Sequence, residues 1–118
     1  MNRKITRLYT GSDGESHFEE IEVPLNDMGE RGRRSELIKA TGIIFMETDG
    51  NYFLDWHNVP HQQFSIQLEG HLEIEVGDGT RRRFGPGDVL LAEDTTGRGH
   101  ISRAVNNIPR KNIFVILV

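Results

Sequence analysis

Three histidines and one glutamine carry the side chains best suited to hold a metal ion or to move a proton. They are His57, His61, Gln63 and His100. On an extended strand, residues of equal parity share a face, so His57, His61 and Gln63 can point into one cavity. Pro60 lies within this run. Because proline cannot donate to a sheet, a bulge or turn there decides where His61 points.

Any metal in this chain would be held by nitrogen and oxygen ligands. The sequence has no cysteine, which excludes thiolate ligands, thiolate nucleophiles and disulfides. A divalent ion needs three or four ligands at about 2.0–2.2 Å, and mixed imidazole and oxygen donors suit Zn²⁺, Ni²⁺, Fe²⁺ or Mn²⁺. His57 and His100 would supply two ligands. His61 would be the third if it turns inward, and is otherwise an exposed histidine; Gln63 would add an amide oxygen or simply line the cavity.

Residues 63–68 alternate strictly between polar and apolar side chains. The polar members are Gln63, Ser65 and Gln67, and the apolar members are Phe64, Ile66 and Leu68. This period of two predicts a strand with two distinct faces. Buried polar groups need partners, so an inward polar face predicts a pocket lined by Ser65 and Gln67 and completed by a ligand, water or a metal. The apolar members would then pack between the sheets, and Trp56 would form core or pocket wall.

Short strands separated by turns must position these groups. The expected extended segments are 4–10, 18–23, 38–47, 51–57, 63–68, 72–76, 81–84, 89–91, 100–105 and 113–118. Residues 26–35 are polar and contain glycine, which predicts a loop or a short helical turn. Nine or ten strands at intervals of about 8–12 residues, without a long helix, indicate an antiparallel sandwich or barrel. A barrel is favoured because closure removes exposed strand edges.

The run from His57 to Gly70 resembles the first motif of the cupin superfamily. Gln63 and Gly70 have the spacing of that motif's glutamate and glycine, and His57 stands where its first histidine belongs. The turn at residues 84–88 is similar to the entry of the second motif, and His100 falls near that motif's histidine. The resemblance implies a small single-domain cupin of the conserved-barrel type. Its fold would be an all-β, antiparallel double-sheet jelly-roll barrel over residues 1–118, with the motif-bearing core at about 53–105.

The same resemblance implies a divalent-metal-dependent enzyme acting on a small organic substrate, of dioxygenase, isomerase, decarboxylase or lyase type. His57 and His100 would hold the metal, and Glu93 would be the acid–base partner, with Glu93 or Asp94 also available as ligands from a long loop. The chain has valine where the motif's second histidine belongs and glutamine where its glutamate belongs. These departures motivate an alternative, a metal-free or weakly metallated binding or sensory module. A dimerisation domain without a pocket is a third possibility.

Charge and composition narrow the partners. A net charge of −4 and a pI of about 5.7 disfavour nucleic acid and anionic membranes. The longest apolar run, Ile113 to Val118, is too short to span a bilayer, and the start of the chain lacks the apolar stretch of a signal peptide, so a cytoplasmic location is expected. We expect a homodimer, because the apolar first and last strands supply surface to bury. His17, His71 and Arg81–Arg83 are interpreted as solvated side chains.

Overall fold

The computed structural model describes residues 2–118, which form strands and one short 3₁₀ helix. The strands are β1 (Asn2–Thr10), β2 (Ser16–Pro24), β3 (Asn26–Asp27), β4 (Arg33–Arg34), β5 (Ala40–Thr48), β6 (Phe53–His57), β7 (Gln63–Glu69), β8 (Leu72–Glu75), β9 (Arg81–Phe84), β10 (Val89–Ala92), β11 (His100–Ala104) and β12 (Arg110–Leu117). The helix η1 (Gly29–Arg31) lies in the segment expected to be a loop or short helical turn. In the described part of the chain, no helix has the length and apolarity needed to cross a membrane.

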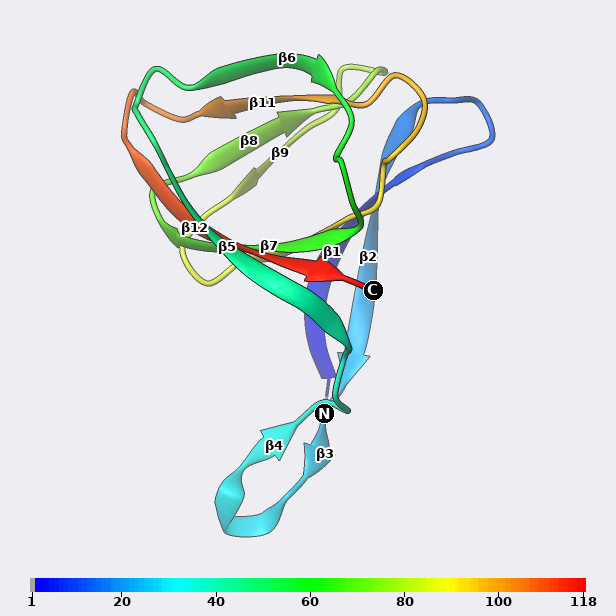
Figure 1. Ribbon diagram of the computed structural model, residues 1–118, viewed down its shortest axis with the longest axis vertical. Helices are drawn as coiled ribbons and strands as arrows, with labels where there is room; N and C mark the ends of the chain where they lie inside the picture. The colour runs from blue at the N-terminus through cyan, green and yellow to red at the C-terminus, as the bar shows by residue number, and fades with distance from the viewer. Residues whose placement is uncertain (1) are drawn as a thin grey trace.

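Two sheets face each other and enclose the core (Figure 1). One has six strands in the order β2-β1-β10-β7-β12-β5, and the other has four in the order β6-β11-β8-β9. Their inner faces meet in a cluster of buried apolar side chains: Leu8, Val59, Leu72, Ile74, Val76, Phe84, Leu90 and Ala92. This arrangement confirms the predicted all-β jelly-roll type of fold. One pairing departs from the antiparallel expectation, because β1 runs parallel to β10, which the long stretch of chain between them permits.

The polar face of β7 points inward, as the alternation predicted. Gln63, Ser65 and Gln67 are all buried. Ser65 pairs with Leu90 of β10 on one side and with Phe114 of β12 on the other, which places it at the centre of the inner face. The expectation that the apolar members of β7 pack between the two sheets is wrong. They occupy the opposite face of the strand, because inward polar groups leave only the outer face for them, and Leu68 is 47% exposed there.

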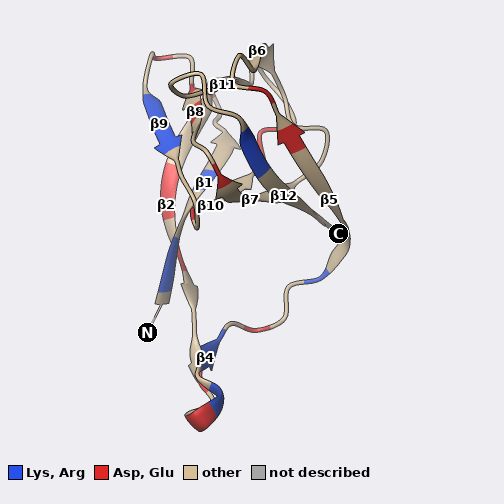
Figure 2. Ribbon diagram, turned by 90° about the vertical axis from the view of Figure 1, so that its left-hand side faces the viewer, with Lys and Arg blue, Asp and Glu red and all other residues tan. Residues whose placement is uncertain are grey.

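The chain between β2 and β5 leaves the barrel as an arm. β3 and β4 pair with each other, Asn26 with Arg34 and Asp27 with Arg33, and the arm projects beyond the barrel in both views (Figures 1 and 2). It connects β2 and β5, the two edge strands of the six-stranded sheet. Acidic and basic residues lie around η1 at the tip of the arm (Figure 2). No residue of η1 is buried, so the tip of the arm adds nothing to the barrel core.

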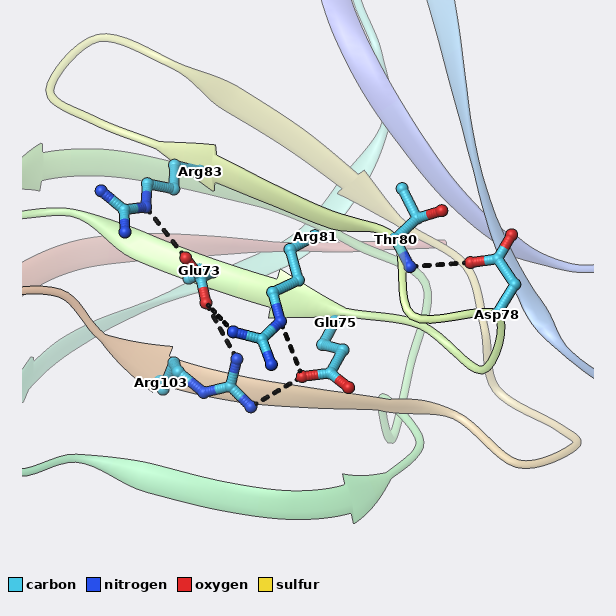
Figure 3. Close-up of polar contacts among 7 residues, drawn as sticks. All are labelled: Glu73, Glu75, Asp78, Thr80, Arg81, Arg83 and Arg103. Atoms are coloured by element: carbon cyan, nitrogen blue, oxygen red, sulfur yellow. Dashed lines mark hydrogen bonds and ion pairs between the residues drawn. The ribbon is translucent and has the colours of Figure 1, made fainter.

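A network of ion pairs covers the outer face of the four-stranded sheet (Figure 3). Glu73 of β8 accepts hydrogen bonds from Arg83 of β9 and Arg103 of β11, both at 2.9 Å. Glu75 accepts from Arg103 at 2.9 Å and lies 3.1 Å from Nε of Arg81. Within the arginine run expected to be a solvated hairpin, Arg81 and Arg83 therefore also tie β9 to β8, and Arg103 ties β11 to β8.

Candidate functional site

Strand pairing brings His57 and His100 together. They are direct cross-strand partners at the ends of β6 and β11, and their ring centroids lie 4.3 Å apart. Gly99 permits this approach for two reasons. Its φ of +78° is a conformation that side-chain-bearing residues rarely adopt, and a Cβ there would lie 1.9 Å from the His57 carbonyl oxygen. The glycine before His100 is therefore part of the site's architecture.

A β-bulge in β6 determines which side chain faces the cavity. Leu54 pairs with Ser102 and His57 with His100, so β6 uses three residue steps where β11 uses two. Both Leu54 and His57 consequently line the same cavity, although they differ in parity. The bulge leaves Trp56 outside the lining, where the Arg98 guanidinium stacks over its ring at 4.1 Å. Trp56, expected as core or pocket wall, supports the neighbouring loop instead.

His100 is held by a buried carboxylate. Its Nδ1 lies 2.6 Å from Oδ2 of Asp94, and the Ser16 hydroxyl donates to the same oxygen at 2.7 Å. Asp94 has no exposed surface, and His100 and Ser16 are 4% and 1% exposed. A carboxylate only accepts hydrogen bonds, so Nδ1 of His100 carries a hydrogen and Nε2 is the nitrogen left to exchange a proton with a bound molecule. The contact fixes both the tautomer and the orientation of the ring.

His57 is oriented in a similar way. Its Nδ1 lies 2.7 Å from the carbonyl oxygen of Asp55, which can only accept, so Nε2 is the nitrogen with a lone pair. Burial lowers the pKa of His57, and the neighbouring His100 ring acts in the same direction. The Asp55 hydrogen bond opposes the shift without reversing it. The pocket therefore favours a neutral His57 near pH 7.

The loop that carries Asp94 is held by hydrogen bonds from Asn58 and by an ion pair between Glu93 and Arg7. The Asn58 side-chain amide donates to the carbonyl oxygens of Thr96 and Gly97 at 2.8 and 3.1 Å. Glu93 points the other way: its carboxylate pairs with Arg7 and is not in the cavity lining. Neighbouring side chains of an extended segment point to opposite sides, so only one of the two acids can reach the histidines, and it is Asp94.

The histidines border a cavity of about 360 Å³ between the two sheets. Most of its lining is apolar, including Leu54, Leu72, Ile74, Leu90 and Phe114. The polar lining consists of Tyr52, His57, Asn58, Gln63, Ser65, His100, Ser102 and Arg110. A cavity of this size, with an apolar wall and polar groups that converge on it, is typical of a small-molecule site.

The remaining sequence-predicted residues are divided between the cavity and the surface. Gln63 and Ser65 line the cavity, whereas Gln67 lies beyond its lining and donates to Ser65 Oγ at 2.8 Å. His61 is exposed, outside the lining, in the bend that follows Pro60. The structure thus brings His57, Gln63 and His100 to one cavity and leaves His61 outside.

These residues do not form an ordinary metal-ligand set. Within residues 2–118, no group of three or more His, Cys, Asp or Glu side chains is arranged to hold a metal ion. The cavity offers two imidazoles and otherwise neutral oxygens, whereas catalytic zinc sites use three protein ligands that are histidine, cysteine or carboxylate. Asp94, the nearest acid, is already engaged by His100 and Ser16. A divalent cation therefore fits this donor set poorly.

Comparison with known proteins supports the fold. The structure is similar to a putative ethanolamine utilization protein Q from Salmonella typhimurium, with 15% identity, a TM-score of 0.52 and coverage of 99% of this chain and 97% of that one. It is also similar to the conserved protein SPY1581 of unknown function from Streptococcus pyogenes, with 19% identity, a TM-score of 0.52 and coverage of 70% and 68%. No protein-family model and no curated protein matches the chain. At these identities the likeness supports a cupin-like fold and carries no function.

Proposed function

We propose that this cupin-type barrel binds a small organic molecule in its cavity and exchanges a proton with it through His100, without a metal. The observation that carries the proposal is the buried contact between His100 and Asp94 at the cavity wall. Proton transfer needs a base whose tautomer is fixed and whose charged form is stabilised. Asp94 supplies both, because it holds the Nδ1 hydrogen and lies beside the imidazolium that forms when Nε2 takes a proton.

His57 gives the site its second polar group. Its ring lies so close to His100 that two protonated rings would repel each other strongly. The lowered pKa of His57 keeps its own ring neutral. A neutral His57 can accept a hydrogen bond at Nε2 from a bound molecule or from water. Among the expected reaction classes, isomerisation and elimination need proton transfer at carbon, which this pair of side chains can provide.

Solvent exchange tests the proposal without knowledge of the substrate. The protein is incubated in D₂O with a panel of small keto acids and hydroxy acids, and loss of carbon-bound proton signals is followed by ¹H NMR. We expect exchange at a carbon next to a carbonyl for at least one compound. His100→Gln should abolish it, and His61→Gln, which changes an exposed histidine, should not.

Two other results would contradict the proposal. If compounds stabilise the fold thermally but none exchanges, the chain is the binding or sensory module that its departures from the cupin motif allow. If exchange appears only after loading with Ni²⁺, Mn²⁺, Fe²⁺ or Zn²⁺ and disappears with EDTA, the reaction depends on a metal after all. Metal content of the purified protein, measured without an affinity tag, separates this case from the first.

A further inference from the structure

Arg110 is a buried cation that no carboxylate balances within the described residues 2–118. It begins β12, is 2% exposed and lines the same cavity as His57 and His100. Its Nε and Nη1 are buried without a hydrogen-bond partner, and within residues 2–118 its guanidinium forms no ion pair with a carboxylate. The nearby aromatic ring of Tyr52, 5.2 Å from the guanidinium carbon, offers only a cation–π contact.

This arrangement differs from that of two partly buried arginines elsewhere in the fold, Arg7 and Arg103. Arg7 pairs with Glu19 and Glu93, and Arg103 pairs with Glu73 and Glu75. Arginine stays protonated in proteins, so it cannot avoid the cost of burial by losing its charge. Burial nevertheless disfavours its charged form, which lowers the pKa of Arg110 from its ordinary value. An unbalanced charge of this kind destabilises the chain unless a partner completes it.

We propose that Arg110 binds the carboxylate of a small monocarboxylic acid whose apolar part occupies the rest of the cavity. This inference rests on the proposed function in that the acid would be the molecule presented to His100. The guanidinium has five N–H donors in a planar fork that matches a carboxylate. Apolar side chains such as Leu72, Ile74 and Phe114 make up most of the remaining lining. One cation surrounded by apolar surface suits a single negative charge better than a doubly charged phosphate.

Tyr52 favours the same class of ligand. Its ring is half-buried in the cavity lining, and burial raises the pKa of its phenol, so the hydroxyl remains protonated and available as a donor. No second Lys or Arg is part of the lining. A phosphate or a dicarboxylate would therefore leave one charge unmatched in a largely apolar space.

Matched acids and amides test the proposal. Benzoate, cyclohexanecarboxylate and hexanoate are compared with their amides by thermal shift and calorimetry. We expect wild-type protein to prefer at least one acid over its amide by about tenfold or more in Kd, as a charge-assisted hydrogen-bond pair requires. Arg110→Met should remove this preference while leaving amide binding unchanged. Equal binding of acids and amides, or a preference that survives in Arg110→Met, would overturn the proposal.

The stability of the ligand-free variants separates ligand binding from a purely structural role. Without its ligand, the unpaired charge of Arg110 costs stability. Arg110→Met removes that charge, so the variant should unfold at the same or a higher temperature than wild type. Arg103→Met, which breaks a satisfied network, should unfold at a lower temperature. A large loss of stability in Arg110→Met would mean that the arginine is structural, and would contradict the proposal.

His100→Gln makes failure of this inference distinguishable from failure of the proposed function. The variant should keep the preference for acids, because His100 is not the anion partner. If no variant or wild-type protein exchanges protons but the Arg110-dependent preference is present, the carboxylate site stands and the catalytic role of His100 falls. If exchange occurs without any preference for acids, the catalytic role of His100 stands and the carboxylate site at Arg110 is refuted.

Discussion

At the scale of single residues, the site depends on which nitrogen of His100 carries its proton. Asp94 makes this choice, and the Ser16 hydroxyl holds the Asp94 carboxylate in place from the other side. Asn58 holds the loop that carries Asp94, because its side-chain amide donates to the carbonyl oxygens of Thr96 and Gly97. Asp94 and Ser16 are not part of the cavity lining, so substitutions of these two residues test the chemistry separately from ligand contacts.

Asp94→Asn tests this positioning role. The amide can donate as well as accept, so His100 Nδ1 is no longer required to be the protonated nitrogen. We expect any proton exchange catalysed by the protein to fall by about 10²-fold or more, the range typical for acid–base groups. ¹⁵N NMR of the imidazole should show a mixed or changed tautomer. Glu93→Gln, a change of the adjacent acid that pairs with Arg7, is the matched control; an unchanged tautomer in Asp94→Asn would refute the role.

At the scale of elements, the strand rhythm of this chain could be predicted and its irregularities could not. Alternation in residues 63–68 predicted the inward polar face of β7, because a period of two is visible in the sequence. The bulge in β6 has no such signal, since no glycine or proline marks it, yet it turns His57 rather than Trp56 inward. The choice of Glu93 over Asp94 failed to match the structure for a related reason, because parity is uncertain in an irregular loop.

The other residues of the candidate site could not be predicted, because they lie far from the histidines in the sequence. Arg110 and Ser16 reach the site from strands that are remote in sequence, and a single arginine or serine at a strand end carries no local pattern. One observation could have flagged Arg110: it begins a strand whose core, Ile113 to Leu117, is continuously apolar. Prediction from the sequence thus reached the histidine pair and the polar strand, and the remaining groups needed the sheet registers.

The ion-pair network on the four-stranded sheet makes a prediction about stability and pH. Hydrogen bonds from Arg83 and then Arg103 lower the pKa of Glu73 below its ordinary value of 4.5. A carboxyl whose pKa is lower in the folded state stabilises the fold above its unfolded pKa, and this contribution disappears as pH falls through the folded pKa. Stability measured by urea unfolding should therefore decline below about pH 4.5.

Glu73→Gln should remove much of that acid limb and reduce the free energy of unfolding at pH 7 by about 1–2 kcal/mol, the scale of charge-assisted hydrogen bonds. The network joins β8 to β9 and β11 (Figure 3), so the loss is shared by three strands. Glu20→Gln, which breaks an exposed 3.6 Å pair with Lys4, should change stability much less. Equal effects from the two substitutions would show that the network contributes no more than a surface ion pair.

At the scale of the whole molecule, the outer face of the six-stranded sheet is left uncovered within the described chain. The register places Ile113 between Phe45 and Ile66, and Val115 between Ile43 and Phe64. We call these residues the outer apolar face: Ile43, Phe45, Phe64, Ile66, Ile113 and Val115. Phe45 is 75% exposed and Ile43 is 57% exposed. A contiguous apolar patch of this kind marks an interaction surface.

A second copy of the chain is the partner that this face suits best. The outer apolar face contains no charged side chain, so a two-fold contact of the face with itself opposes no like charges. It includes the last strand, β12, as the expectation of a homodimer assumed. The first strand, β1, lies between β2 and β10 inside the sheet and supplies no residue of the outer apolar face. The homodimer therefore remains a prediction, now with a defined surface.

Sedimentation velocity tests that prediction. Wild-type protein should sediment at twice the 13.4 kDa chain mass, and Phe45→Glu should shift it toward the monomer, because two carboxylates would be buried against apolar surface. Phe53→Glu is the matched control, since Phe53 is 56% exposed but lies in β6 of the other sheet. A wild-type monomer, or equal dissociation by both substitutions, would show that the outer apolar face is not where copies meet. The cavity opens between the sheets rather than on this face, so Phe45→Glu should leave the preference for carboxylic acids intact.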